Sequence, residues 1–342
     1  AIDVPIVPEV DETLAALRRR RVDMVPLSLP REVAAAVEGL GTRVVDGPSY
    51  LGTVLMFNVR QPPFDAAAAR TAVAAALDLG RLARAAGEAT PAENGYLHPD
   101  SAWAPDAVLH RFDPGAASRL AGGQAPIEIV APGNDPVRLE AGRQVVLALE
   151  RAGVAATLRP LSREDLAASV GEDGSPPTFQ AAIWTAPPLA SYDPDFLGRV
   201  FGSRPEQAPS NHSGYASADF DRAAARVATT TDGPARRDAV EEALRTLARD
   251  APVVPLYFPT GRYAYRPAVY DGWVFVKGSG ILDKRSFVEP AARAAGGEPP
   301  PGPAPEGAGR GLSPLGLLAL AVLGAAGLLA AYLVAASARR RA

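Results

Sequence analysis

The chain of 342 residues contains no cysteine, and this absence excludes disulfide bonds, cysteine-based metal sites and thiol nucleophiles. It also excludes a lipid-modified cysteine as the membrane anchor of this chain. Only three histidines are present (His98, His110 and His212), and none has a partner at metal-ligand spacing, so no metal site is expected. A net charge of −3 gives no basic surface for nucleic acid.

Catalytic motifs are missing as well. The chain has no G-x-S-x-G elbow, no H-E-x-x-H pair, no P-loop and no dinucleotide-binding glycine pattern, and Gly278-Ser279-Gly280 is too short to count as one. The paired acids Asp219 and Asp221 stand at an expected helix start, where capping explains them. We therefore expect neither an enzyme nor a bound cofactor.

The most informative stretch that is present runs from Leu55 to Arg70. It predicts a short apolar strand, a double-proline turn and then a helix rich in alanine. Asp65 is the predicted N-cap of this helix, because its carboxylate can accept from the free N–H groups of the first turn. Asp78 is the predicted cap of a second, shorter helix that ends at Gly87.

The middle of the chain has the pattern of an α/β protein. The hydrophobic spacing predicts a strand at 127–130, a helix at 138–151 that ends before Gly153, and a strand at 154–158. Two strands joined by one helix with short links are expected to be parallel. The remaining predicted elements are a strand at 179–184 and helices at 222–228 and 236–248.

The C-terminal region has the composition of a membrane anchor. Leu315–Ala336 is an apolar run of 22 residues without charge, long enough for a hydrocarbon core of about 30 Å. Three arginines, Arg339 to Arg341, follow this run, so the tail is expected in the cytoplasm and the rest outside. Before it, 11 of the 21 residues from 291 to 311 are proline or glycine, which predicts an extended linker.

Several segments together resemble the solute-binding proteins of the peptide and nickel class of ABC importers. The residues that carry the resemblance at the informative stretch are Phe57-Asn58, Pro63-Phe64-Asp65, Arg70 and Asp78. Further segments agree in the same order along the chain: Leu14–Asp23, Asn211–Tyr215 followed by Asp219–Asp221, and Ala251–Tyr257. Arg20 departs from the family pattern, which usually has glycine there.

The resemblance implies an α/β, periplasmic-binding-protein-like fold with two lobes, of which the first is incomplete. The chain is then expected to be the C-terminal portion of a longer exported protein; a natural short form is the alternative. The implied parts are a first-lobe remnant (1–56), the second lobe (57–256), a return to the first lobe (257–290), the linker (291–311), one transmembrane helix (312–338) and a cytoplasmic tail (339–342). The hinge is expected near 55–59 and 254–258.

The resemblance also implies where a ligand lies. The expected ligand-binding residues are Phe57, Asn58, Trp184, Thr185 and Ala186. In peptide-binding relatives a carboxylate three residues after the aromatic pairs with the peptide amino group, and a basic residue often precedes the aromatic by three positions. Here those positions hold Pro187 and Ala181, so two charged contacts are missing. Asp193 and Asp195 could substitute for the carboxylate; the other reading is a turn that caps the next helix.

The resemblance predicts a membrane-tethered extracytoplasmic receptor that delivers a ligand to an ABC importer. Its expected partners are a small peptide-like ligand or a metal chelate, the permease subunits, and the lipid bilayer through Leu315–Ala336. The alternative is a sensor or scaffold protein that keeps the receptor fold without serving transport.

Overall fold

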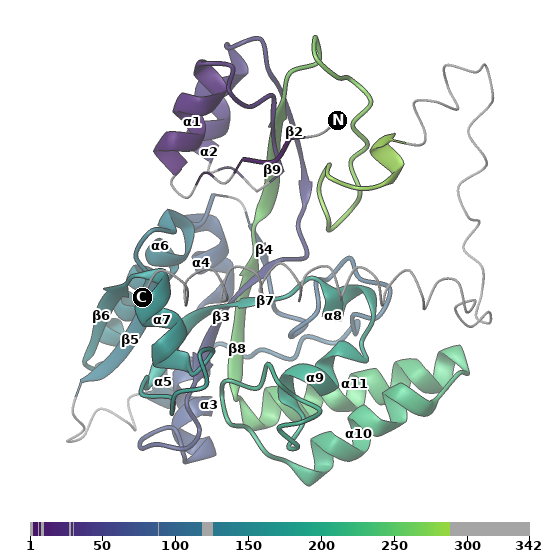
Figure 1. Cartoon of the computed structure of the whole chain (residues 1–342). Helices are drawn as coiled ribbons and strands as arrows, with labels where there is room; N and C mark the ends of the chain where they lie inside the picture. Colours follow the sequence, from purple (N-terminus) through teal and green to yellow (C-terminus); the bar gives the residue numbers. More distant parts are fainter. Residues whose placement is uncertain are drawn as a thin grey trace. The chain divides into compact units, whose positions relative to one another are not determined.

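The computed structural model describes residues 3–5, 7, 10–26, 29, 31–87, 89–117 and 126–287 (Figure 1). The predicted linker, membrane helix and tail lie outside these residues. Within the described part of the chain, no helix combines the length and the apolar character that a membrane span requires.

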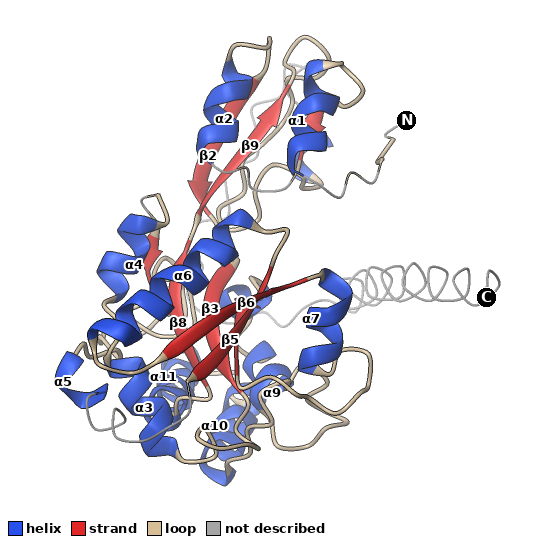
Figure 2. Ribbon diagram, turned by 90° about the vertical axis from the view of Figure 1, so that its left-hand side faces the viewer, coloured by secondary structure: helices blue, strands red, loops and turns tan. Residues whose placement is uncertain are grey.

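A mixed six-stranded sheet forms the larger part of the described structure (Figure 2). Its strands β5, β6 and β7 are parallel, whereas β3 runs antiparallel to both β7 and β8, and β4 runs antiparallel to β8. In spatial order the strands are β4 (Thr90–Pro91), β8 (Val253–Phe258), β3 (Gly52–Phe57), β7 (Ala181–Ala186), β5 (Ile127–Pro132) and β6 (Ala156–Leu161).

The predicted strand–helix–strand crossover is confirmed by β5, α6 (Pro136–Arg151) and β6, because β5 and β6 pair in parallel. The helix begins two residues earlier than predicted. Asp135 accepts from the Arg138 N–H as the N-cap, and Pro136 takes the first helical position, where its missing N–H costs nothing. Gly153 has a φ of 79° directly after the helix, as expected of the residue that ends it.

Helices cover both faces of the six-stranded sheet. Alternate residues of β3 point to opposite faces: Leu55 and Phe57 enter one hydrophobic core, and Val54 and Met56 enter the other. The first core includes residues of α3 (Ala67–Ala75), α4 (Leu79–Ala85) and α6. The second includes residues of α7 (Arg163–Val170), α8 (Leu189–Tyr192), α9 (Phe196–Phe201), α10 (Ala218–Thr229) and α11 (Gly233–Asp250). β3 is therefore buried along its whole length.

The capping prediction is right at Asp78 and wrong at Asp65. Asp78 accepts from the Arg81 N–H at 2.8 Å and begins α4. The Asp65 carboxylate bonds only the adjacent Ala66 N–H, because the chain is still in the turn there and α3 starts at Ala67. Arg70 secures this turn instead: its buried guanidinium donates to the backbone oxygens of Phe64, Asp65 and Asp250.

The same correction applies to α10. Its N-cap is Ser217, whose hydroxyl accepts from the Phe220 N–H at 3.3 Å. Asp219 and Asp221 lie in the first turn, where their charges favour the positive end of the helix dipole.

A smaller, three-stranded sheet contains β1 (Met24–Val25), β9 (Thr260–Tyr265) and β2 (Arg43–Pro48) in that spatial order, all antiparallel. Its core is shared with α1 (Val10–Arg18) and α2 (Arg31–Glu38). The short helix α5 (Pro114–Ala117) completes the described elements. The chain passes between the two sheets at 49–51 and returns at 259, so β3 and β8 lie wholly in the larger sheet. The predicted lobe boundaries stay predictions.

Candidate functional site

Two of the five predicted site residues, Phe57 and Asn58, lie in the protein interior at the C-terminal end of β3. Neither is exposed. The Phe57 ring centroid lies 4.4 Å from that of Phe64. Asn58 Nδ2 donates to the Phe179 carbonyl at 3.0 Å, and its Oδ1 accepts from the Arg60 N–H at 3.2 Å. All polar atoms of the Asn58 side chain thus have partners within the fold.

The other three residues, Trp184, Thr185 and Ala186, lie at the C-terminal end of β7. Trp184 and Thr185 are partly exposed, whereas Ala186 is buried opposite Gly52, the first residue of β3. Phe57 ends β3 five residues later. Trp184 lies opposite Val54, three residues before Phe57, so at about 3.4 Å per residue the separation from Phe57 along β3 runs from roughly 10 Å for Trp184 to roughly 17 Å for Ala186. The structure therefore does not bring the five predicted residues together.

The end of β7 lies where the two sheets join, beside a group of four rings that we name the junction cluster: Tyr50, His98, Tyr192 and Phe258. The Tyr50 ring lies 4.7 Å from His98 and 5.1 Å from Tyr192, and His98 lies 4.9 Å from Phe258, all between centroids. Tyr50 comes from the connection between the sheets, Tyr192 from α8 and Phe258 from the end of β8. Such rings offer flat apolar faces with polar edges.

Polar contacts tie the junction cluster to the segment that follows the smaller sheet. Lys277 Nζ lies 2.9 Å from Asp100 Oδ2. The Tyr192 hydroxyl lies 2.7 Å from the Lys277 carbonyl oxygen and 2.8 Å from Ser279 Oγ. Gly278 allows this approach: its φ is 85°, and a Cβ there would lie 2.5 Å from the Tyr192 hydroxyl.

The junction cluster is uncharged near neutral pH. Burial lowers the pKa of His98 to about 4 and raises the pKa of Tyr50 to about 12. Burial also raises the pKa of Tyr192, and the hydrogen bond from Lys277 lowers the pKa of the Asp100 carboxyl. Because none of these groups titrates near pH 7, the arrangement suits binding through hydrogen bonds and ring faces rather than proton transfer.

The two acids proposed as substitutes for the missing carboxylate are engaged elsewhere. Asp193 Oδ1 accepts from the Asp195 N–H at 3.2 Å, which confirms the predicted turn. Asp195 makes no capping hydrogen bond to α9, so that part of the prediction was wrong. Arg236 Nη2 lies 3.0 Å from Asp193 Oδ1 and 3.6 Å from Asp195 Oδ1, within ion-pair distance of both acids. Ala181 is buried at the start of β7.

Among the residues that the structure describes, no group of three or more His, Asp or Glu side chains is placed to hold a metal ion. His98 belongs to the junction cluster. His110 Nε2 lies 2.8 Å from the Leu77 carbonyl oxygen, and His212 Nε2 lies 4.0 Å from Glu172 Oε1. The three histidines therefore lie in three separate places.

Sequence reasoning missed most of the junction cluster. Tyr50, His98 and Tyr192 stand in no motif, and Lys277 lies far along the chain from all of them. The one available signal was the glycine pair around Ser279, because a glycine with positive φ marks a place where another group approaches the backbone closely.

The sequence matches the family model described as bacterial extracellular solute-binding proteins, family 5, middle region, over residues 1–205. No curated protein matches the sequence.

Solved structures of the same fold are found. The ABC transporter substrate-binding protein CtaP (Lmo0135) from Listeria monocytogenes has a TM-score of 0.69 and 21% identity, over 82% of this chain and 58% of that chain. The oligopeptide-binding protein AppA from Bacillus subtilis, in complex with a nonapeptide, has a TM-score of 0.67 and 17% identity over 82% and 58%. NikZ from Campylobacter jejuni, in complex with Ni(L-His), has a TM-score of 0.67 and 17% identity over 81% and 58%. This chain thus spans about 58% of the length of each of these structures.

Proposed function

Because the chain belongs to the bacterial extracellular solute-binding proteins of family 5, we propose that it is part of a receptor that captures a peptide-like ligand outside the cytoplasm and delivers it to an ABC importer. The observation that carries this proposal is the family match over residues 1–205. The fold supports it, since similar structures were solved with a nonapeptide and with Ni(L-His). A metal chelate is therefore the second ligand class to test.

We place the ligand at the end of β7, beside the junction cluster. Trp184 and Thr185 are partly exposed there. Leu51, Leu189 and Tyr192 are large hydrophobic side chains that remain exposed in the same region. Because a ligand that touches residues of both sheets would bind best when they are held together, its binding would favour closure at the junction. Such closure would let permease subunits distinguish loaded from empty receptor.

The membrane tether is a further part of the proposal. It rests on the composition of Leu315–Ala336 and on the arginines that follow. In this arrangement the receptor stands outside the membrane on the proline- and glycine-rich linker.

A second function is favoured by one specific observation. Ala181 and Pro187 stand where charged residues are expected in peptide-binding relatives, and Asp193 and Asp195 are paired with Arg236. If the protein does not bind a free peptide, a role as a sensor or scaffold that keeps the receptor fold is favoured.

Native mass spectrometry of the intact protein, purified from the cells that make it, tests the proposal. We expect a co-purified peptide or chelate, and saturable binding when dipeptides, a nonapeptide and Ni(L-His) are titrated. If none of these probes binds, the receptor role is contradicted. Binding without any loss of ligand uptake when the gene is deleted would instead favour the sensor.

A further inference from the structure

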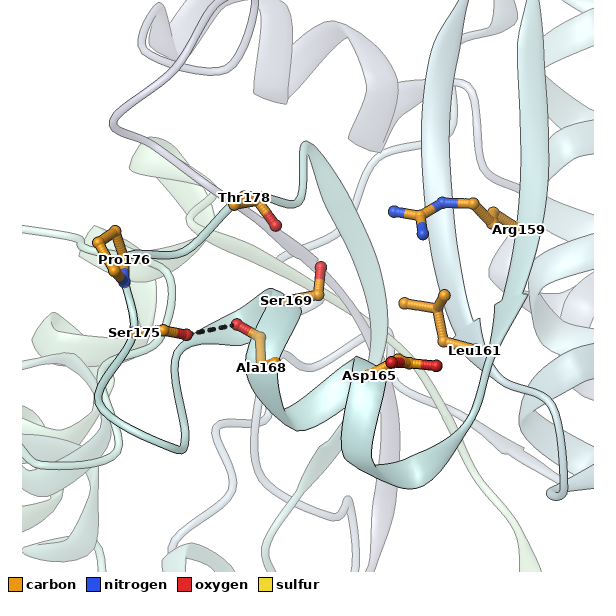
Figure 3. Close-up of a pocket in the computed structure, with 8 residues that line it drawn as sticks. All are labelled: Arg159, Leu161, Asp165, Ala168, Ser169, Ser175, Pro176 and Thr178. Atoms are coloured by element: carbon orange, nitrogen blue, oxygen red, sulfur yellow. Dashed lines mark hydrogen bonds between the residues drawn. The ribbon is translucent and has the colours of Figure 1, made fainter.

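A cavity of about 660 Å³ lies between the edge strand β6, helix α7 and the loop before β7 (Figure 3). Leu161 lines it, and the pairing of β5 with both β6 and β7 puts Leu161 level with Trp184. Both side chains pack against the same hydrophobic core. The cavity therefore adjoins the proposed ligand position and is not a separate site.

A run of four arginines, Arg18 to Arg21, lies elsewhere in the fold, and we name it the basic turn. Arg18 is the last residue of α1, and all four residues are exposed. Among the residues that the structure describes, none of the four guanidinium groups has an ion-pair or hydrogen-bond partner. Like charges this close repel one another, so the basic turn does not stabilise the folded chain by its charge.

The end of α1 is closed without these side chains. The Arg20 N–H donates to the Leu17 carbonyl oxygen at 3.1 Å. The Arg21 N–H donates to that of Ala16 at 2.9 Å, which completes a Schellman cap. The buried guanidinium of Arg266 also donates to the Leu17 carbonyl oxygen. Cations often serve the carbonyl groups at a helix C-terminus, but here the backbone and Arg266 already do so.

The backbone of Arg20 is a second unusual feature of the basic turn. Its φ is 56°, in the left-handed region that a Cβ atom disfavours and that glycine adopts freely. The chain therefore holds an arginine where glycine would be more stable. A residue kept in a costly backbone conformation points to a role for its side chain.

The basic turn lies at the end of the smaller sheet that is remote from the proposed ligand position. Pro48 of β2 pairs with Thr260 of β9 beside the connection to the larger sheet. From there β9 runs to Tyr265, roughly 17 Å away at about 3.4 Å per residue. Arg266 follows directly and contacts Leu17 at the end of α1. A partner of the basic turn would thus leave the ligand position free.

We propose that the basic turn docks on an anionic phospholipid surface. A guanidinium group binds phosphate through two N–H donors at once, and four in a row can contact several headgroups of one bilayer. Clusters of this size bind anionic membranes. The proposed tether would keep such a surface close, so that weak contacts suffice. The docking does not depend on the ligand or on its position.

Fluorescence quenching on vesicles measures the docking of the intact protein. Because the chain has no cysteine, Ala36→Cys provides a single labelling site, exposed on α2. Arg266 joins the end of α2 to that of α1 through the Leu40 and Leu17 carbonyl oxygens, so this label lies near the basic turn. Ala68→Cys, exposed on α3, carries the control label.

The vesicles contain a quencher on their headgroups and consist of phosphatidylcholine with or without phosphatidylglycerol. Phosphatidylglycerol should increase quenching at position 36 more than at position 68, and high salt should reverse the increase. The comparison holds whether or not the tether inserts, because phosphatidylcholine alone reports a tethered protein that is not docked. Equal quenching at position 36 with and without phosphatidylglycerol would overturn the proposal.

Arg20→Gly separates charge from stability. It relieves the backbone, so the midpoint of thermal unfolding should rise by about 2 °C. The ratio of quenched to unquenched label at position 36 should nevertheless fall about fivefold, at the phosphatidylglycerol content that half-quenches the parent. A variant that docks as the parent does, or that is no more stable, would contradict the account of Arg20.

Replacement of all four arginines of the basic turn by glutamine should lower the same ratio by roughly a hundredfold or more. The matched control carries glutamine at four exposed arginines elsewhere and should dock as the parent does: Arg111, Arg151, Arg163 and Arg204. An equal loss in the control would mean that only net charge matters. Displacement by free glycerol 3-phosphate at constant ionic strength would indicate a site for a soluble phosphate. Either result would refute docking through the basic turn.

Discussion

The two ends of the β3–β7 strand pair are built in different ways. At one end Phe57 and Asn58 are fully buried, and their ring and amide contacts are all made within the larger sheet and its cover. At the other end Trp184 and Thr185 are partly exposed, and the Trp184 ring lies 5.6 Å from that of His212. The junction cluster lies near the last residue of β7 and contacts the segment that follows the smaller sheet through Tyr192 and Lys277. The first end is closed by contacts within the fold, whereas the second is the surface at which we propose that the ligand binds.

The residues of the family motif and the proposed ligand position therefore lie at different ends of this strand pair. The stretch around Phe57 carries the strongest resemblance, yet its residues are occupied by the fold. The contrast predicts that substitutions at the buried end lower stability with little effect on ligand affinity beyond that loss. Substitutions at the junction end should lower ligand affinity more than they lower stability.

The largest stability effect is expected for Phe57→Ala. Removal of a fully buried ring should lower the free energy of unfolding by about 3–5 kcal/mol. Urea unfolding of the intact protein measures this, with Phe112→Ala as the control. Phe112 is 49% exposed, so its loss should change stability by no more than about 0.5 kcal/mol. Equal losses of stability in the two variants would contradict the structural role of the buried Phe57 ring.

Asn58→Ala should come next, at about 2 kcal/mol. The substitution leaves the buried Phe179 carbonyl and the Arg60 N–H without their present partner. Thermal unfolding followed by circular dichroism measures the loss. A variant that keeps its stability but no longer binds ligand would show that Asn58 belongs to the binding surface after all.

At the junction, acid should destabilise the protein through His98. The folded pKa is about 4, below the ordinary value of 6.5, so the unfolded state binds more protons between these values and stability falls as pH drops through this range. His98→Asn keeps an acceptor for the Asp100 N–H, which His98 Nδ1 accepts at 2.9 Å, and removes the titration. Unfolding at pH 7 and pH 4.5 should show a smaller loss in this variant than in the parent. Identical losses would refute the role of His98.

The smallest stability effect is expected for Tyr192→Phe, at about 1 kcal/mol. The variant keeps the ring and loses the contacts to Lys277 and Ser279. Hydrogen exchange should become faster at residues 277–280 and remain unchanged in β3. Faster exchange throughout the larger sheet would mean that Tyr192 supports the scaffold rather than the junction.

Sequence reasoning reached furthest where the signals are local. The β5–α6–β6 crossover follows from hydrophobic spacing within about forty residues, and Asp78 and Gly153 act as their chemistry predicts. The prediction failed at Asp65, because a carboxylate can cap a helix only if the preceding turn ends at its own residue, and here the helix starts at Ala67.

The junction could not be predicted in this way. The pairing of β3 with both β7 and β8 joins segments that are more than 100 positions apart. The hydrophobic periodicity of one sequence predicts strands but does not show which strands pair with one another. Tyr50, His98 and Tyr192 each look ordinary in their local sequence. Only the folded chain shows that their rings meet.

The proposed ligand position can be tested most directly with Trp184 as the only tryptophan. The chain has three, so Trp103→Phe combined with Trp273→Phe leaves Trp184 as the sole reporter. Its emission is followed while a nonapeptide, a dipeptide or Ni(L-His) is added to the intact protein, and calorimetry measures binding in parallel. We predict that a probe that binds shifts the Trp184 emission with the same midpoint as the calorimetric titration. Binding that leaves this emission unchanged, or the failure of every probe to bind, would contradict a ligand site at the end of β7.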